Sequence, residues 1–182
     1  MGLDMYLHKK TYVKNWKGDK TENKHEVIVK GRHAGHVRPE RLSHVVEEVM
    51  YWRKANQVHN WFVQNCVTSN DWNGEEVWVT RDNLAELLDI CEKVLAGSKL
   101  VAGKVTNGYR GENGKMIPNM EDGKLIEDDS VAKELLPSSD GFFFGSTEYN
   151  EWYLKDVEKT RDCLKALLAE PDESEFYYSA SW

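Results

Sequence analysis

The chain has 182 residues, of which 40% are hydrophobic and 30% charged, and its formal net charge is −7. This length suits one domain with a sizeable core, and the apolar content excludes an intrinsically disordered chain. No apolar run approaches the roughly 20 residues of a membrane-spanning helix, and residues 1–10 lack the apolar core of a secretory signal. We therefore expect a cytoplasmic protein with no membrane partner.

Cysteine and histidine spacing argues against a metal centre. The three cysteines form no CxxC pair, so neither a disulfide framework nor a zinc ribbon is expected. Four histidines between residues 25 and 44 have no cysteine or carboxylate at ligand spacing. These are His25, His33, His36 and His44. No HExxH, GxSxG or phosphate-loop motif is present, so we expect no metal, no cofactor and no catalysis.

The first elements are predicted to be strands. Leu3–Val13 alternates apolar and polar side chains, which is typical of a strand with one buried face. Residues 15–24 are polar and form a turn. His25–Lys30 contains three consecutive β-branched residues and predicts a second short strand. Residues 31–39 hold two glycines and a proline and are expected to be a loop.

The middle of the chain favours helices. Ser43–Asn65 has apolar residues at steps of three and four, which predicts one helix with Asn56 and His59 on its apolar face. Val77–Val79 predicts a strand. A helix is then expected to run from an N-cap at Thr80 to Ala96.

The last third alternates short elements with one long helix. A short helix is predicted from Ser130 to Leu136, and Phe142–Phe144 predicts a brief buried strand. Thr147 is the predicted N-cap of a helix that ends at Ala169. The aromatic segment Phe176–Trp182 is expected to be extended and docked on the core.

Residues 103–129 are polar and contain three Asn-Gly or Asp-Gly pairs, which are typical of hairpin turns. We expect a mobile hairpin insert there. Residues 1–182 then form a single α+β domain, in which a small mixed or antiparallel sheet packs against three main helices.

A polar pocket is one candidate site. A buried polar side chain on an apolar helix face needs a hydrogen-bond partner, so Asn56 and His59, with Arg53 nearby, either form a structural network or line a ligand pocket. The glycine turn before Ser146 and Thr147 leads into a helix and either caps it or presents backbone N–H groups to an anion.

Charge is unevenly distributed along the chain. The first 54 residues hold 12 lysines and arginines against 7 acidic residues, whereas the remainder holds 12 against 24. Such a distribution either steers a charged partner or belongs to a solvated surface. The candidate acidic contacts are Glu121, Asp122, Glu127, Asp128 and Asp129. The candidate nucleic-acid contacts are Lys9, Lys10, Lys14, Lys17, Lys20 and Arg32.

Four stretches resemble one family of small, mostly uncharacterised proteins encoded by phages, prophages and bacterial genomes. They are MGLDMYL at 1–7, YWRKANQVHNWF at 51–62, LLPSSDGFFFGSTEYNEWY at 135–153 and FYYSASW at 176–182. The length and distribution of this family are similar to those of anti-CRISPR proteins that inhibit Cas9. The resemblance implies a phage-derived, non-catalytic inhibitor that binds a host Cas9-type nuclease with its guide RNA and blocks DNA binding or cleavage.

Two alternatives remain beside this expectation. One is a small-molecule-binding protein or enzyme with a polar pocket around His59 and Ser146. The other is a DNA-binding protein that uses the basic N-terminal third of the chain.

Overall fold

The main sheet of the protein is antiparallel and four-stranded. A computed structural model describes residues 2–112, 115–141, 143–170 and 174–182. Over these residues the fold is α+β, as predicted. The sheet has the strand order β2-β1-β6-β3. Its strands are β1 (Asp4–Tyr12), β2 (His44–Arg53), β3 (Val77–Val79) and β6 (Glu175–Ser181).

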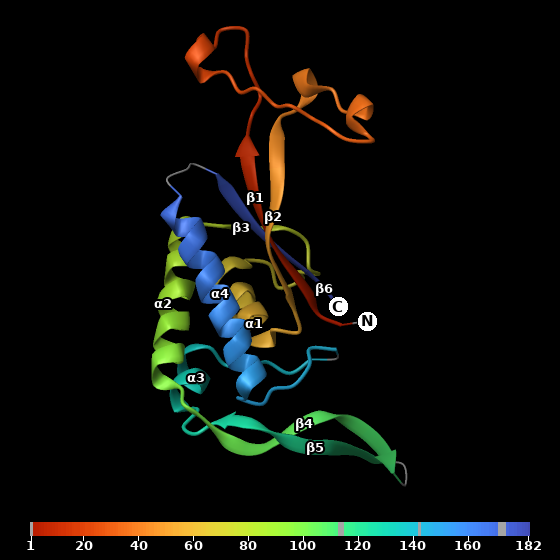
Figure 1. Cartoon of the computed structure of the whole chain (residues 1–182), viewed down its shortest axis with the longest axis vertical. Coiled ribbons are helices and arrows are strands. Elements are labelled where there is room, and N and C mark those ends of the chain that lie inside the picture. Colours follow the sequence, from red (N-terminus) through yellow and green to blue (C-terminus); the bar gives the residue numbers. More distant parts are fainter. Residues whose placement is uncertain (1, 113–114, 142, 171–173) are drawn as a thin grey trace.

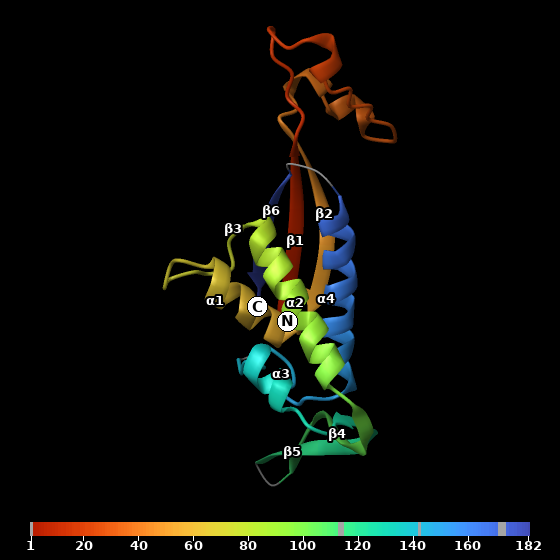
Figure 2. The same cartoon turned by 90° about the vertical axis from the view of Figure 1, so that its left-hand side faces the viewer.

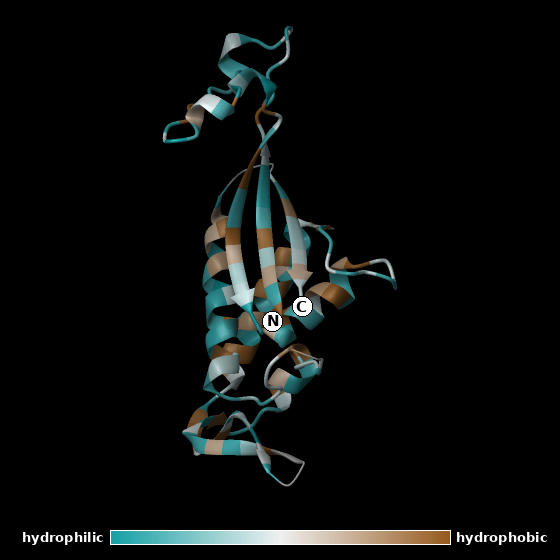
Figure 3. Ribbon diagram, turned by 90° about the vertical axis from the view of Figure 1, so that its right-hand side faces the viewer, coloured by the Kyte–Doolittle hydropathy of each residue, from teal (hydrophilic) through white to brown (hydrophobic). Residues whose placement is uncertain are grey.

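Helices cover one face of this sheet. The long helices α2 (Arg81–Gly97) and α4 (Glu151–Ala169) lie side by side on it, with α1 (Asn56–Cys66) beside them (Figures 1 and 2). Met5 and Leu7 of β1 point into the core between the layers and are fully buried. The opposite face of the sheet carries no described helix and is open in Figure 3.

A second, two-stranded sheet projects from one end of the molecule (Figure 1). It consists of β4 (Leu100–Glu112) and β5 (Lys115–Ile126), and the short helix α3 (Ser130–Leu135) follows it. The polar hairpin predicted within 103–129 is therefore present, although its strands span 100–126 and so begin and end three residues earlier than predicted. Val105 and Ile126 bury their side chains at its base.

A long connection between β1 and β2 projects from the other end (Figures 1 and 2). We call residues 13–43 the basic arm, because they hold eight lysines and arginines against four acidic residues. The arm contains three short 3-10 helices and no strand, so the strand predicted at His25–Lys30 is wrong. β-Branched residues favour a strand only where a neighbouring strand pairs with them, and the fold provides none here.

The single helix predicted at Ser43–Asn65 is also wrong. Its first half is strand β2, which pairs with β1 along its length, and only its second half is helix α1. Lys54 separates the two elements with a φ of 61°, a left-handed conformation that neither a strand nor a right-handed helix continues through. The strand also contains an irregularity opposite Leu7 and His8, which disturbs its period of two.

Two predictions before α4 need correction. Phe143 lies in a turn with a φ of 90° and Phe144 is not in a strand, while Phe142 lies outside the described residues. The N-cap of α4 is Asn150 and not Thr147, because the Asn150 Oδ1 accepts from the backbone N–H groups of Trp152 and Tyr153.

Other predicted elements are confirmed. Strand β1 and strand β3 occupy the predicted positions, and Thr80 caps α2 in a reciprocal capping box with Asn83. The C-terminal aromatic segment is strand β6, which pairs with β1 on one side and β3 on the other.

Candidate functional site

His59 lies in a buried aromatic cluster. Its Nδ1 is 2.8 Å from the Tyr178 hydroxyl, and its ring centroid is 5.1 Å from that of Phe144 and 5.6 Å from that of Trp182. Burial lowers the pKa of His59 to about 4, so the imidazole is neutral at pH 7. This buried side chain connects α1 to Tyr178 of the C-terminal strand.

Asn56 joins the start of α1 to the glycine turn. Its Nδ2 donates to the carbonyl oxygens of Phe144 and Ser146, at 3.1 and 2.9 Å, and its Oδ1 accepts from the Ser139 N–H at 3.1 Å. The two segments that the sequence proposed for one pocket are therefore neighbours. Asn56 itself is a structural residue, since these backbone contacts use its amide group.

A polar pocket of about 280 Å³ opens where β2, α1, the glycine turn and the start of α4 meet. Its lining residues are Arg53, Lys54, Gln57, Thr106, Gly145, Ser146, Glu148, Asn150, Trp152, Tyr153 and Asp156. Of the five residues proposed from the sequence, Arg53 and Ser146 line it. Thr147 lines a separate, shallower pocket beside Lys104 and Tyr149.

Some polar groups of this pocket are already satisfied. The Glu148 carboxylate accepts from the Thr106 N–H at 3.0 Å and from the Thr106 hydroxyl at 2.5 Å. The Ser146 hydroxyl accepts from the Glu148 N–H at 3.1 Å. These contacts tie the hairpin to the turn before α4, and they hold one wall of the pocket in place.

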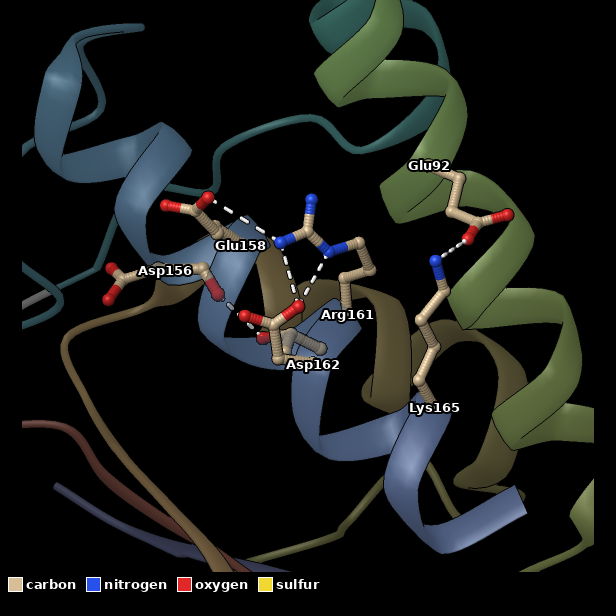
Figure 4. Close-up of polar contacts among 7 residues, drawn as sticks. Glu92, Asp156, Glu158, Arg161, Asp162 and Lys165 are labelled. Carbon is tan, nitrogen blue, oxygen red and sulfur yellow. Dashed lines mark hydrogen bonds and ion pairs between the residues drawn. The ribbon is translucent and has the colours of Figure 1, made fainter. Parts of the chain in front are cut away.

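Gln57 and Asp156 are among the lining residues that sequence reasoning missed. Gln57 is only 3% exposed, and its Nε2 makes no hydrogen bond within the described part of the chain. Burial raises the pKa of Asp156 to about 6; Lys159, the Gln57 amide and Lys155 offset only a part of that rise. In Figure 4 the Asp156 side chain points away from Arg161 and its carboxylate partners. The only sequence signal is that Asp156 lies one turn after Trp152 on α4.

The backbone beside the pocket is constrained. Lys54 has a φ of 61°, and Gly145 has a φ of 92°. A Cβ on Gly145 would lie 3.1 Å from the Lys54 Cβ, so only glycine fits easily there. Non-glycine residues in such conformations cost free energy and concentrate at functional sites.

The five acidic candidates, which we call the acidic segment, lie on and after the hairpin, and each of them has a partner in the same chain. Asp122, Glu127 and Asp129 form ion pairs of 2.7, 3.1 and 2.8 Å with lysines. Glu121 accepts from Asn107, and Asp128 accepts from the Ser130 N–H. The Ser130 side chain and then this N–H lower the pKa of Asp128. The negative charge of Asp122, Glu127 and Asp129 is thus partly neutralised by lysines of the same chain.

The basic candidates divide into two groups. Lys9 and Lys10 lie on β1 and form ion pairs with Glu170 and Glu76. The other four lie on the basic arm: Lys14, Lys17, Lys20 and Arg32. Among the described residues, no lysine or arginine of the arm lies within 4.0 Å of a carboxylate oxygen. The Lys14 ammonium lies 4.2 Å from the ring centroid of Trp16, which is 57% exposed.

Over the described residues, no cluster of three or more histidines, cysteines or carboxylates could hold a metal ion. No helix in the same ranges is both long and apolar enough to cross a membrane. Comparisons with protein-family models, with curated proteins and with solved structures each gave no match.

Proposed function

We propose that the protein is a phage-derived, non-catalytic inhibitor that binds a host Cas9-type nuclease with its guide RNA and blocks DNA binding or cleavage. The observation that supports this proposal best is the separation of charge along the molecule. The basic arm holds eight lysines and arginines against four acidic residues, whereas the rest of the chain holds 16 against 27. The arm projects at one end, away from the acidic body (Figure 1).

Such a molecule suits a partner that carries both signs of charge. A nuclease with bound guide RNA offers phosphates and a positively charged channel. The unpaired cations of the arm complement the phosphates, and the carboxylates of the body complement the channel. Charge complementarity of this kind raises association rates and is weakened by salt, because the screening length is about 10 Å at 0.1 M.

Direct DNA binding through the arm is a second candidate. It is favoured by the exposed Trp16 next to Lys14, since an aromatic ring among cations can stack on a base while the cations contact phosphates. DNA binding of this kind would occur without the nuclease, and its affinity would fall steeply as the salt concentration rises.

The test is capture of purified Cas9 with guide RNA by the tagged protein, at about 50 mM and about 500 mM salt. An arm variant carries alanine at four positions: Lys14, Lys17, Lys20 and Arg32. A control variant with the same change in charge carries alanine at four helix positions: Lys93, Lys155, Lys159 and Lys165. A third variant reverses Glu127, Asp128 and Asp129 to lysine.

Capture at low salt that the arm variant loses and the control keeps supports the proposal. Loss of capture by the third variant indicates that the acidic segment also contacts the nuclease, provided that the circular dichroism spectrum of this variant matches that of the natural protein. Failure to capture the nuclease at low salt contradicts the proposal. Retention of unrelated DNA under the same conditions would favour the second candidate.

A further inference from the structure

The buried amide of Gln57 is incompletely satisfied at the floor of the pocket, because it lies close enough to Asp156 to lower the pKa of that carboxyl, yet its Nε2 makes no hydrogen bond of normal geometry with a described residue. The side chain is 3% exposed. A buried amide without its full set of partners destabilises a fold, and such groups are rare in native proteins. The amide lines the pocket of about 280 Å³, so a ligand that enters it can supply the missing acceptor.

Two cations stand at the rim of the same pocket. Arg53 has only a loose contact with a carboxylate, with its Nε 4.0 Å from Asp4 Oδ1. Lys54 forms no ion pair with a described residue, and its left-handed backbone holds it next to Gly145. Together with the Gln57 amide, these side chains present donors suited to the oxygens of a phosphate group.

The remaining wall offers different chemistry. Trp152 is 58% exposed, and the Lys155 ammonium lies 5.1 Å from the centroid of its ring. An exposed indole provides a surface on which a planar base can stack. Asp156 lines the same wall, and its carboxyl group can accept hydrogen bonds from hydroxyl groups.

We infer that this pocket binds a nucleoside monophosphate. The phosphate would contact Arg53, Lys54 and Gln57, the ribose hydroxyls would contact Asp156, and the base would stack on Trp152. The volume of the pocket, about 280 Å³, lies just below the usual range of roughly 300 to 1,000 Å³ for ligand sites, which suits one nucleotide and no longer ligand. This inference is independent of the proposed inhibition, because it uses residues outside both the basic arm and the acidic segment.

The experiment is isothermal titration calorimetry, in which the full chain is titrated with AMP, GMP, CMP and UMP at low salt. Adenosine and inorganic phosphate serve as probes that each lack one half of the nucleotide. The variant Gln57→Met removes the buried amide at nearly constant volume, and Gln64→Met is its control on the exposed side of α1. Arg53→Gln removes an exposed cation and tests the phosphate contact even if Gln57→Met does not fold.

We expect at least one nucleotide to bind about tenfold or more tightly than adenosine or phosphate. Gln57→Met and Arg53→Gln should each weaken that binding by about tenfold, whereas Gln64→Met should leave it unchanged. Absence of binding by all four nucleotides at millimolar concentration overturns the inference. Binding that persists unchanged in both pocket variants also overturns it, since the ligand would then lie elsewhere.

Discussion

Asp156 and His59 make opposite contributions to the pH dependence of stability. Burial raises the pKa of Asp156 from 3.8 to about 6, so the folded state holds a proton that the unfolded state has lost between these values. Stability from this group therefore falls as pH rises from about 4 to about 6. Burial lowers the pKa of His59 from 6.5 to about 4, so stability from that group falls as pH drops through the same range.

The two contributions are similar in size. Each pKa unit corresponds to roughly 1.4 kcal/mol, so the change from 3.8 to about 6 at Asp156 amounts to at most about 3 kcal/mol. The change from 6.5 to about 4 at His59 also amounts to about 3 kcal/mol. In the natural protein the two therefore largely cancel between about pH 4 and pH 6.

The variant Asp156→Asn separates the contribution of Asp156 from that of His59. It should be more stable than the natural protein by up to about 3 kcal/mol at pH 7 and equally stable below about pH 4. The assay is urea unfolding at half-unit pH steps from 4 to 7, with Asp71→Asn, at an exposed loop position, as the control for loss of one negative charge. If the difference in free energy of unfolding between Asp156→Asn and the natural protein does not change with pH, burial does not raise the pKa of Asp156 as argued.

Three further predictions concern the fold. Gly74→Ala should lower the free energy of unfolding by about 3 kcal/mol or more in urea titrations, because Gly74 has a φ of 96° and an added Cβ would lie 2.0 Å from the Ala180 carbonyl oxygen. Asn150→Ala should cost about 1 kcal/mol through loss of the α4 cap, while Thr147→Ala should cost less, and equal losses in thermal unfolding would contradict the assigned cap. Cys91 is fully buried, and burial raises the pKa of its thiol to about 12; mass spectrometry should find it alkylated by iodoacetamide only after denaturation, and rapid labelling of the folded protein would argue against this packing.

Elements with local signals could be predicted from the sequence. Thr80 and the apolar stripe after it specify α2 within a few residues, because the cap and the 3.6-residue period both lie in the segment itself. The boundary between β2 and α1 could not be predicted, since the residues of β2 pair with β1 some 40 positions away and the apolar spacing in Ser43–Asn65 fits a helix as well. The left-handed conformation of Lys54 has no signal in the sequence.

The candidate site was predictable only in part. Arg53 and Ser146 were placed at one pocket from the polar residues around them, and both line it. Gln57 and Asp156 were missed because their roles depend on burial, which arises only when the elements around the pocket assemble. The acidic residues were predicted from the sequence as partner contacts or as a solvated surface, but Asp122, Glu127 and Asp129 each have a lysine partner. Sequence spacing does not reveal that partner for the first two.

The measurement that tests the proposed inhibition most directly is cleavage of a matched DNA target by purified Cas9 with guide RNA, titrated with the protein at low salt. The account predicts that cleavage falls to zero near equimolar protein, that the inhibition weakens as salt rises, and that the alanine variant of the basic arm loses it while the helix-lysine control does not. Cleavage that continues at an unchanged rate in the presence of a large excess of protein would contradict the account.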